Sequence, residues 1–239
     1  MQRGLCQSIE EAQHQISLGV VRVNGSIVLN SARQVSAQDT LIVRHADQFV
    51  SRGGLKLEAA LESFNIDVQG KRVLDAGAST GGFTDCLLQR GANEVVAVDV
   101  GKAQLHEKVA SDARVNVIDS FNVRQLVDTD LPGDLVRPFD IVVADLSFIS
   151  LKSVASALRA RLSEDGHLVV LVKPQFEATK QEVDKGRGII SDQKIRDRVL
   201  DEIAESLQNQ GLHECGRIES PIRGAEGNVE YLVWYRFEA

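Results

Sequence analysis

Beyond residue 50, short apolar runs alternate along the chain with segments whose apolar residues have helical spacing. Five of these runs have the length of buried strands: Arg72–Asp75, Glu94–Asp99, Val115–Ile118, Asp140–Asp145 and His167–Lys173. Helical patterns lie before or between most of them, at residues 57–64, Phe83–Arg90, Leu105–Ser111 and Ser150–Leu162. Strands that alternate with helices predict a parallel, doubly wound sheet.

The last part of the chain departs from this alternation. A long helix is predicted at Ser191–Gln210, followed by strands at Leu212–Ser220 and Asn228–Phe237. Only Pro221–Gly227 separates these two strands, which is too short for a crossover helix, so they should be antiparallel. The predicted fold class is therefore α/β and Rossmann-like. Its mostly parallel seven-stranded sheet, with an antiparallel last strand, resembles a class I methyltransferase more than a dehydrogenase.

The first 46 residues carry a smaller pattern of their own. Ser8–Glu11 has the form of a capping box that opens a short helix. Val20–Val23 and Ile27–Leu29 flank Asn24-Gly25, which predicts a hairpin with a type I′ turn, and a further β run follows at residues 40–44. We expect a small α+β module at residues 1–46, a polar linker at 47–52 and the larger domain at 53–239.

The amino-acid composition limits the class of protein to which the chain can belong. The chain has 239 residues, 43% hydrophobic and 26% charged, as in ordinary globular proteins. No run approaches the ~18 apolar residues of a membrane span, and the first 30 residues lack a secretory signal. The three cysteines lie far apart without metal spacing. We expect a cytoplasmic protein with no metal and no membrane partner.

Net charge changes the picture of possible partners. The chain carries −7 overall; four arginines and three acids in residues 1–46 give +1, which leaves −7 − 1 = −8 for the remainder. Polyanions bind basic surfaces, so the total alone argues against a nucleic-acid partner. The amino-terminal module is the less acidic part of the chain.

The stretch Val73–Phe83 carries the clearest functional signal. An apolar run ends in Asp75 and then passes through Gly77, Ser79, Gly81, Gly82 and Phe83 into a helical pattern. A strand, a tight glycine turn and a helix N-terminus let backbone N–H groups approach a ligand closely. This arrangement predicts a pocket for a nucleotide-like cofactor.

Gly77-Ala-Ser79-Thr-Gly81 also matches the G-x-S-x-G nucleophile elbow of α/β-hydrolases. Such enzymes place several strands before the nucleophile, whereas only one helix and a small module precede Ser79. No HGGG-type oxyanion segment lies upstream, and no particular acid accompanies His213, the candidate triad base. The hydrolase is therefore the less favoured alternative.

A dinucleotide-binding fold is a second alternative. Its G-x-G-x-x-G motif cradles a pyrophosphate, but here Ser79 replaces the second glycine. Asp75, directly before the turn, would repel a pyrophosphate and suits the ammonium of a methionine moiety. Asp99 ends the next strand, where a carboxylate can accept both ribose hydroxyls. S-adenosylmethionine fits better than NAD, with Asp119 and Asn122 as candidate contacts on the adenine side.

Four further polar residues sit at or beside the expected carboxyl edge of the sheet. Lys56 borders the apolar stripe of the first helix, Asp145 and Lys173 end the fourth and fifth strands, and Glu230 opens the last strand. A lysine that ends a run of five apolar residues is costly to bury without compensation. Alternatively, Lys173 could extend its ammonium group to solvent.

Several segments together resemble one family over nearly the whole chain. They are Val50–Leu57, Asp75–Asp85, Asp145–Ser150, Lys173–Glu177, Lys185–Ile190, Ser220–Gly224 and Gly227–Glu230. They are similar to the TlyA family, historically labelled haemolysin, whose members are ribosomal RNA 2′-O-methyltransferases. The resemblance implies an FtsJ-like, S-adenosylmethionine-dependent methyltransferase behind an S4-like RNA-binding module that is truncated at its start. It also implies a catalytic tetrad at Lys56, Asp145, Lys173 and Glu230, and a cytidine 2′-hydroxyl in ribosomal RNA as substrate.

The chemistry of the four residues is consistent with that activity. A ribose hydroxyl is a poor nucleophile until its proton leaves, and a sulfonium methyl is already an activated donor, so alignment is the main task. A lysine acts as a base only in its neutral form, which burial and a second lysine favour and nearby acids oppose. We assign Lys173 as general base, Lys56 as its neighbour that holds ribose or phosphate, and Asp145 and Glu230 as positioning acids.

Other interpretations remain open at this level. Residues 177–191 mix cations, acids and glycines, which fits either a mobile lid on the RNA side or an ordinary charged loop. A ribosome-binding or assembly factor with a degenerate methyltransferase domain is a second functional class. A membrane-active haemolysin is a third, although no spanning segment supports it.

Overall fold

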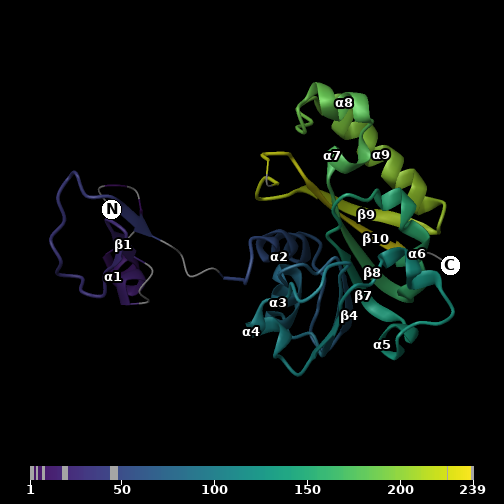
Figure 1. Ribbon diagram of the computed structural model, residues 1–239, viewed down its shortest axis with the longest axis horizontal. Coiled ribbons are helices and arrows are strands. Elements are labelled where there is room, and N and C mark those ends of the chain that lie inside the picture. Colours follow the sequence, from purple (N-terminus) through teal and green to yellow (C-terminus); the bar gives the residue numbers. More distant parts are fainter. Residues whose placement is uncertain are drawn as a thin grey trace. The chain divides into compact units, whose positions relative to one another are not determined.

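The computed structural model describes residues 3, 5–6, 9–17, 21–43, 48–224 and 226–237. The chain divides into two compact units, Met1–Gln48 and Phe49–Ala239 (Figure 1).

The described residues of the smaller unit form one helix and a three-stranded antiparallel sheet. Its elements are α1 (Ile9–Ser17), β1 (Val21–Val23), β2 (Ser26–Ile27) and β3 (Leu41–Val43), with strand order β2-β1-β3. Asn24 and Gly25 have φ values of 52° and 84°, the left-handed pair that a type I′ turn requires. The hairpin prediction is confirmed, whereas the predicted capping residue Ser8 lies outside the described residues.

The larger unit is built on a seven-stranded sheet with the order β6-β5-β4-β7-β8-β10-β9. The strands are β4 (Arg72–Ala76), β5 (Glu94–Val98), β6 (Val115–Ile118), β7 (Phe139–Ala144), β8 (Leu162–Val172), β9 (Leu212–Glu219) and β10 (Tyr231–Phe237). β10 lies antiparallel to both of its neighbours, and the pairs among β4 to β8 are parallel. The predicted sheet and its antiparallel last strand are confirmed.

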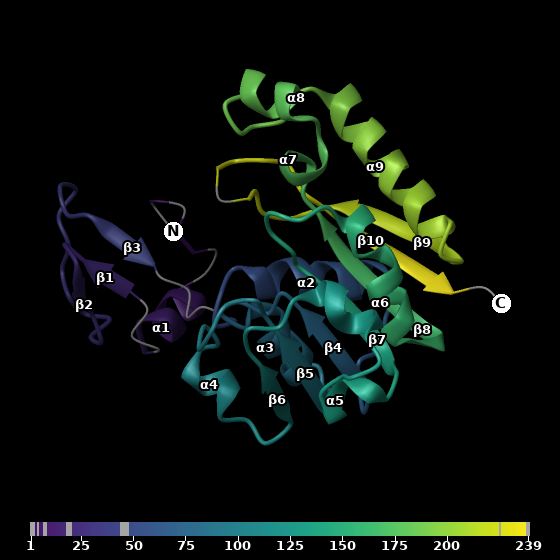
Figure 2. The ribbon, with the colours of Figure 1, turned by 45° about the vertical axis from the view of Figure 1, so that its right-hand side comes forward.

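Helices cover both faces of this sheet. The helical segments of this unit are α2 (Gly53–Ser63), α3 (Gly82–Gln89), α4 (Glu107–Ala110), η1 (Val123–Val127), α5 (Gly133–Val136), η2 (Leu151–Ser153), α6 (Ala155–Arg161), α7 (Pro174–Glu177), α8 (Lys180–Lys185), which has no buried residue, and α9 (Gln193–Gln208). Apolar residues of α2, α3 and α4 pack on one face, and those of α5, α6 and α9 pack on the other (Figures 1 and 2). Successive strand residues alternate between the two cores: Val73 faces one and Leu74 the other.

The connectivity of the sheet determines where a ligand can bind. The chain runs outward from β4 through β5 to β6 and then returns to β7 on the other side of β4. This reversal leaves a crevice at the carboxyl ends of β4 and β7, the position where open α/β sheets bind ligands. The glycine turn after β4 and Asp145 after β7 both lie at this crevice.

The main difference from expectation lies in residues 177–191, which contain the helix α8. A complete capping box begins it: the Thr179 N–H donates to Glu182 Oε2 at 2.9 Å, and the Glu182 N–H donates to Thr179 Oγ1 at 3.4 Å. The signature Thr179-Lys-Gln-Glu182 is present in the sequence, but the surrounding charges and glycines favour a loop.

Within the described part of the chain, no helix combines the length and the apolar character needed to cross a bilayer.

Candidate active site

The glycine turn after β4 has a backbone that ordinary side chains would disturb. Gly77 and Gly81 have φ values of 86° and 91°, and Ser79 also lies in the left-handed region at 47°. A Cβ atom on Gly77 would lie 2.6 Å from the carbonyl oxygen of Asp145. Glycine is therefore needed there for both its conformation and its size. The close approach brings the turn after β4 against the end of β7.

A hollow of about 560 Å³ opens beside this turn. Its polar end is formed by Gly77, Ser79 and Asp99, and its apolar part includes Phe121, Leu146, Phe148 and Ile149. Asp99 accepts hydrogen bonds from the Ser79 N–H at 2.8 Å and the Gly101 N–H at 2.7 Å, one on each carboxylate oxygen. Each oxygen keeps a further lone pair that can accept a hydroxyl. The size and polarity suit a nucleoside.

Asp75 lies behind the turn and lines neither hollow of the site. It is fully buried, and burial raises the pKa of its carboxyl to about 7. The Thr84 hydroxyl donates to Oδ2 at 2.6 Å, while buried Oδ1 has no hydrogen-bond partner among the described residues. A buried oxygen without a partner is a position that a cationic ligand group can satisfy.

This raised pKa predicts a pH-dependent stability. At a pH below the ordinary pKa of 3.8, Asp75 is protonated in both the folded and the unfolded chain. Between about pH 4 and pH 7 the unfolded chain releases this proton and the folded chain keeps it, so the free energy of unfolding falls as pH rises. In Asp75→Asn the part of this pH dependence that comes from the Asp75 carboxyl should disappear. Urea unfolding of both proteins across this range measures it; parallel pH curves would contradict the assignment.

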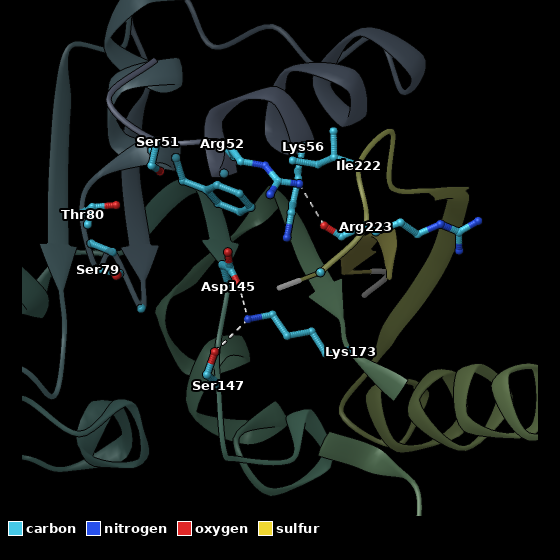
Figure 3. Close-up of a pocket in the computed structure, with 16 residues that line it drawn as sticks. Ser51, Arg52, Lys56, Ser79, Thr80, Asp145, Ser147, Lys173, Ile222 and Arg223 are labelled. Carbon is cyan, nitrogen blue, oxygen red and sulfur yellow. Dashed lines mark hydrogen bonds and ion pairs between the residues drawn. The ribbon is translucent and has the colours of Figure 1, made fainter. Parts of the chain in front are cut away.

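A second hollow, of about 260 Å³, adjoins the first on the side of α2 and β8 (Figure 3). The two hollows share Gly77, Ser79, Asp145 and Ser147 in their walls. Lys56 and Lys173 reach the second hollow from α2 and from the end of β8, as Figure 3 shows. A ligand in the first hollow would therefore meet a ligand in the second beside Asp145.

Two ion pairs organise the polar groups of the second hollow. Lys173 Nζ lies 2.6 Å from Asp145 Oδ1 and donates to Ser147 Oγ at 2.9 Å. Lys56 Nζ lies 2.5 Å from Glu230 Oε2, and this pair is largely buried, with 11% and 3% of the side chains exposed. Glu230 stands behind Lys56 and does not line the hollow.

The second hollow is positively charged although the whole chain carries −7. Its charged lining residues are the cations Arg52, Lys56, Lys173 and Arg223 and the single acid Asp145. The two lysines have acidic partners. Arg223 pairs with Glu219 at 3.2 Å. Arg52 is exposed and donates a hydrogen bond to the Arg223 carbonyl oxygen at 3.2 Å. The hollow therefore favours an anionic ligand.

An aromatic pair stands where the loops after β7 and β8 meet. Phe148 is 91% exposed, and its ring centroid lies 5.0 Å from that of Phe176. Its backbone φ of 63° is unusual for a bulky residue. Lys173 Nζ lies 5.7 Å from the centre of the Phe176 ring. An exposed ring in a strained conformation beside a pocket is a common feature of functional sites.

The structure places the candidate residues in three groups. The first hollow contains Gly77, Ser79, Asp99, Asn122 and Asp145; the second contains Gly77, Ser79, Gly82, Phe83, Lys56, Asp145 and Lys173. The residues that line neither hollow are Asp75, Gly81, Asp119 and Glu230. Of these, Asp119 accepts a hydrogen bond from the Ala103 N–H at 3.0 Å and so holds the turn after β5.

Sequence reasoning did not single out several lining residues. Arg52, Ser147 and Arg223 lie inside the segments that carried the family resemblance, so those segments were the available signal. Gln104 and Phe121 carry no comparable pattern. His213, the triad base of the hydrolase alternative, lies in β9 and lines neither hollow, so the geometry does not support that alternative.

Comparisons with known proteins agree with this architecture. Residues 49–237 match the model of the FtsJ-like methyltransferase family, and residues 2–41 match the S4 domain. The chain is 45% identical over 238 residues to the 16S/23S rRNA (cytidine-2'-O)-methyltransferase TlyA of Mycobacterium tuberculosis, which covers 99% of this chain and 87% of the relative.

Two further relatives carry haemolysin names. Hemolysin A of Brachyspira hyodysenteriae is 41% identical over 232 residues, covering 97% of this chain and 95% of the relative. A solved structure described as a hemolysin from Streptococcus thermophilus superposes with a TM-score of 0.76 at 36% identity, covering 100% of this chain and 86% of that chain. The family match over residues 49–237 and the identity to these relatives show that the chain belongs to the TlyA family of FtsJ-like methyltransferases.

Proposed function

We propose that this protein transfers a methyl group from S-adenosylmethionine to a ribose 2′-hydroxyl, that of a cytidine, in ribosomal RNA. The observation that carries the proposal is the Lys173–Asp145 pair, which stands where the two hollows meet. The similar protein of Mycobacterium tuberculosis is named as a 16S/23S rRNA (cytidine-2'-O)-methyltransferase, which supports the choice of acceptor.

The residues of the first hollow fit S-adenosylmethionine. Asp99 has free lone pairs for the ribose hydroxyls, and the apolar wall near Phe121 suits the adenine, with Asn122 at its edge. The turn at Gly77–Phe83 leaves room for the methionine portion, and Oδ1 of Asp75 behind it is an unused hydrogen-bond acceptor. When bound, the cofactor supplies an activated methyl group on a sulfonium.

The residues of the second hollow would prepare the acceptor. In its neutral form, the Lys173 amine can take the proton of the 2′-hydroxyl, and Asp145, 2.6 Å away, stabilises the ammonium that forms. Lys56 holds the ribose or an adjacent phosphate, and its contact with Glu230 at 2.5 Å fixes the position of its ammonium group. Ser147 restricts the rotation of the Lys173 side chain through its 2.9 Å contact.

The positive second hollow supports an RNA acceptor despite the acidic chain. Arg52 is an exposed cation on its wall that donates to a carbonyl oxygen, and its guanidinium can also donate to a phosphate. We further propose that residues 1–46 act as an S4-like RNA-binding module, joined by a linker at 47–52 to the catalytic domain at 53–239. The match of residues 2–41 to the S4 domain supports this division. Ribosomal RNA as substrate implies action in the cytoplasm.

Arg52→Ala should weaken RNA binding without changing cofactor binding, because Arg52 lines only the second hollow. The KM for RNA should rise, and the slope of log KM against log salt should fall by about 0.7–0.9, the contribution of one lost phosphate contact. Arg137→Ala removes the same charge at the opposite edge of the sheet and is the matched control, since Arg137 precedes β7 and pairs with Glu94. An unchanged salt slope in Arg52→Ala would exclude the phosphate contact.

The direct test of the proposed function is transfer of a labelled methyl group from S-adenosylmethionine to purified 30S particles, 50S particles and naked ribosomal RNA. We expect label in at least one of these acceptors, and mapping of alkali-resistant linkages should place it on a cytidine ribose. Label that maps to a base, or no transfer to any of the acceptors, would refute the proposal.

A further inference from the structure

Two pairs of side chains join the two loops that meet at the candidate site. They are the ion pair of Asp145 with Lys173 and the ring pair of Phe148 with Phe176. The loop after β7 carries Asp145 and Phe148, and the segment after β8 carries Lys173 and Phe176. Each pair therefore depends on the distance between these two loops. Glu177 follows Phe176 directly and ends α7.

Glu177 connects the two loops through both oxygens of its carboxylate. The Ser150 hydroxyl donates to Oε2 at 2.6 Å, and the Leu151 N–H donates to Oε1 at 2.6 Å. These donors form the beginning of η2, which closes the loop after β7. Burial raises the pKa of this carboxyl, while the two hydrogen bonds favour its charged form. Glu177 lines neither hollow, so it has no direct contact with a ligand there.

The loop after β7 is held at its two ends and strained between them. At one end the Asp145 N–H donates to the Ala76 carbonyl oxygen at 3.1 Å. At the other end Ser150 and Leu151 bond to Glu177. Phe148 lies between these anchors with its left-handed φ of 63°. Such a conformation persists only where the surroundings impose it, and the Glu177 contacts are the anchor nearer to Phe148.

We infer that Glu177 is a positioning residue for methyl transfer. Its carboxylate fixes the loop after β7 to α7 and so keeps Asp145 in register with Lys173. This inference rests on the proposed function and adds a residue that acts through the loop rather than on the substrate. Asp145 keeps its backbone bond to Ala76, so loss of the Glu177 anchor would act through the strained part of the loop. Ser147, which accepts from Lys173 Nζ at 2.9 Å, would shift, and Lys173 would lose its fixed position beside Asp145, while Arg52 and Lys56 stay in place.

The test compares Glu177→Ala, Glu177→Gln and the control Glu205→Ala, which removes an exposed glutamate of α9. Rates are expressed per cofactor-binding site, so that misfolded protein does not count. Glu177→Ala should lower kcat about 10- to 100-fold with little change in the KM for RNA. Glu177→Gln should retain most of kcat, because its amide can accept from the Leu151 N–H and donate to Ser150 Oγ.

Wild-type kcat in Glu177→Ala, or equal losses of kcat in the Gln and Ala variants, would overturn the inference. If Glu177→Ala does not fold, Ser150→Ala removes one of the two contacts and should still lower kcat per site; an unchanged kcat there also overturns it. Failure of the proposed function is a different result, because the wild-type protein would then transfer no methyl group to a ribose.

Discussion

Replacing Lys173 by alanine should reduce methyl transfer to ribose by about 10²–10⁴-fold, the usual contribution of a positioned general base. Cofactor binding should stay close to wild type, because Lys173 lines only the second hollow. Lys173→Arg should be equally inactive, since a guanidinium keeps its proton under all ordinary conditions. Single-turnover transfer of labelled methyl groups, together with calorimetric titration of S-adenosylmethionine, separates the two effects.

The matched control is Lys194→Ala, which removes an exposed lysine from the first turn of α9. It should transfer methyl groups at the wild-type rate. Substantial activity in Lys173→Arg would show that positive charge, and not proton abstraction, is what this position provides.

Of the substitutions named above and below, Glu230→Ala should cause the largest loss of stability, about 3–5 kcal/mol in the free energy of unfolding. The variant leaves the ammonium of Lys56 without its partner at 2.5 Å in a position where only 11% of that side chain is exposed. Desolvation of an unpaired charge is costly, whereas an apolar replacement of both partners is often tolerated. The double variant Lys56→Met, Glu230→Leu should therefore be more stable than Glu230→Ala.

Urea unfolding of the two variants and of Glu205→Ala, an exposed control, measures these differences. Glu205→Ala should unfold like the wild type. Equal stability of Glu230→Ala and the wild type would mean that water reaches Lys56 well enough to replace the carboxylate.

The sequence predicts the central sheet well because its strands are continuous apolar runs. Arg72–Asp75 and Glu94–Asp99 differ from the observed strands by one residue at their carboxyl ends. The orientation of the last two strands could be predicted because only seven residues, 221–227, separate the predicted strands; in the structure residues 220–230 join β9 and β10. The helix expected at Leu105–Ser111 is shorter, at Glu107–Ala110, since His106 caps it through its contact with the Lys108 N–H at 3.2 Å.

One part of the candidate site could be predicted because its residues follow strand ends. Asp99, Asp145 and Lys173 do so, and the parallel sheet brings strand ends to one edge. Other roles depend on contacts between residues far apart in the sequence. Asp119 holds a turn, Glu177 connects two loops, and Arg52 lies on the wall of the second hollow. The local pattern of the sequence does not predict such contacts.

The position of β10 has a consequence for how the protein is made. β10 lies between β8 and β9, so β9 is synthesised before the strand that joins it to the sheet exists. Glu230, 174 residues after Lys56, arrives with the same final segment. Lys56 therefore has no carboxylate partner until residue 230 has left the ribosome, so this buried ion pair forms late in the folding of the domain.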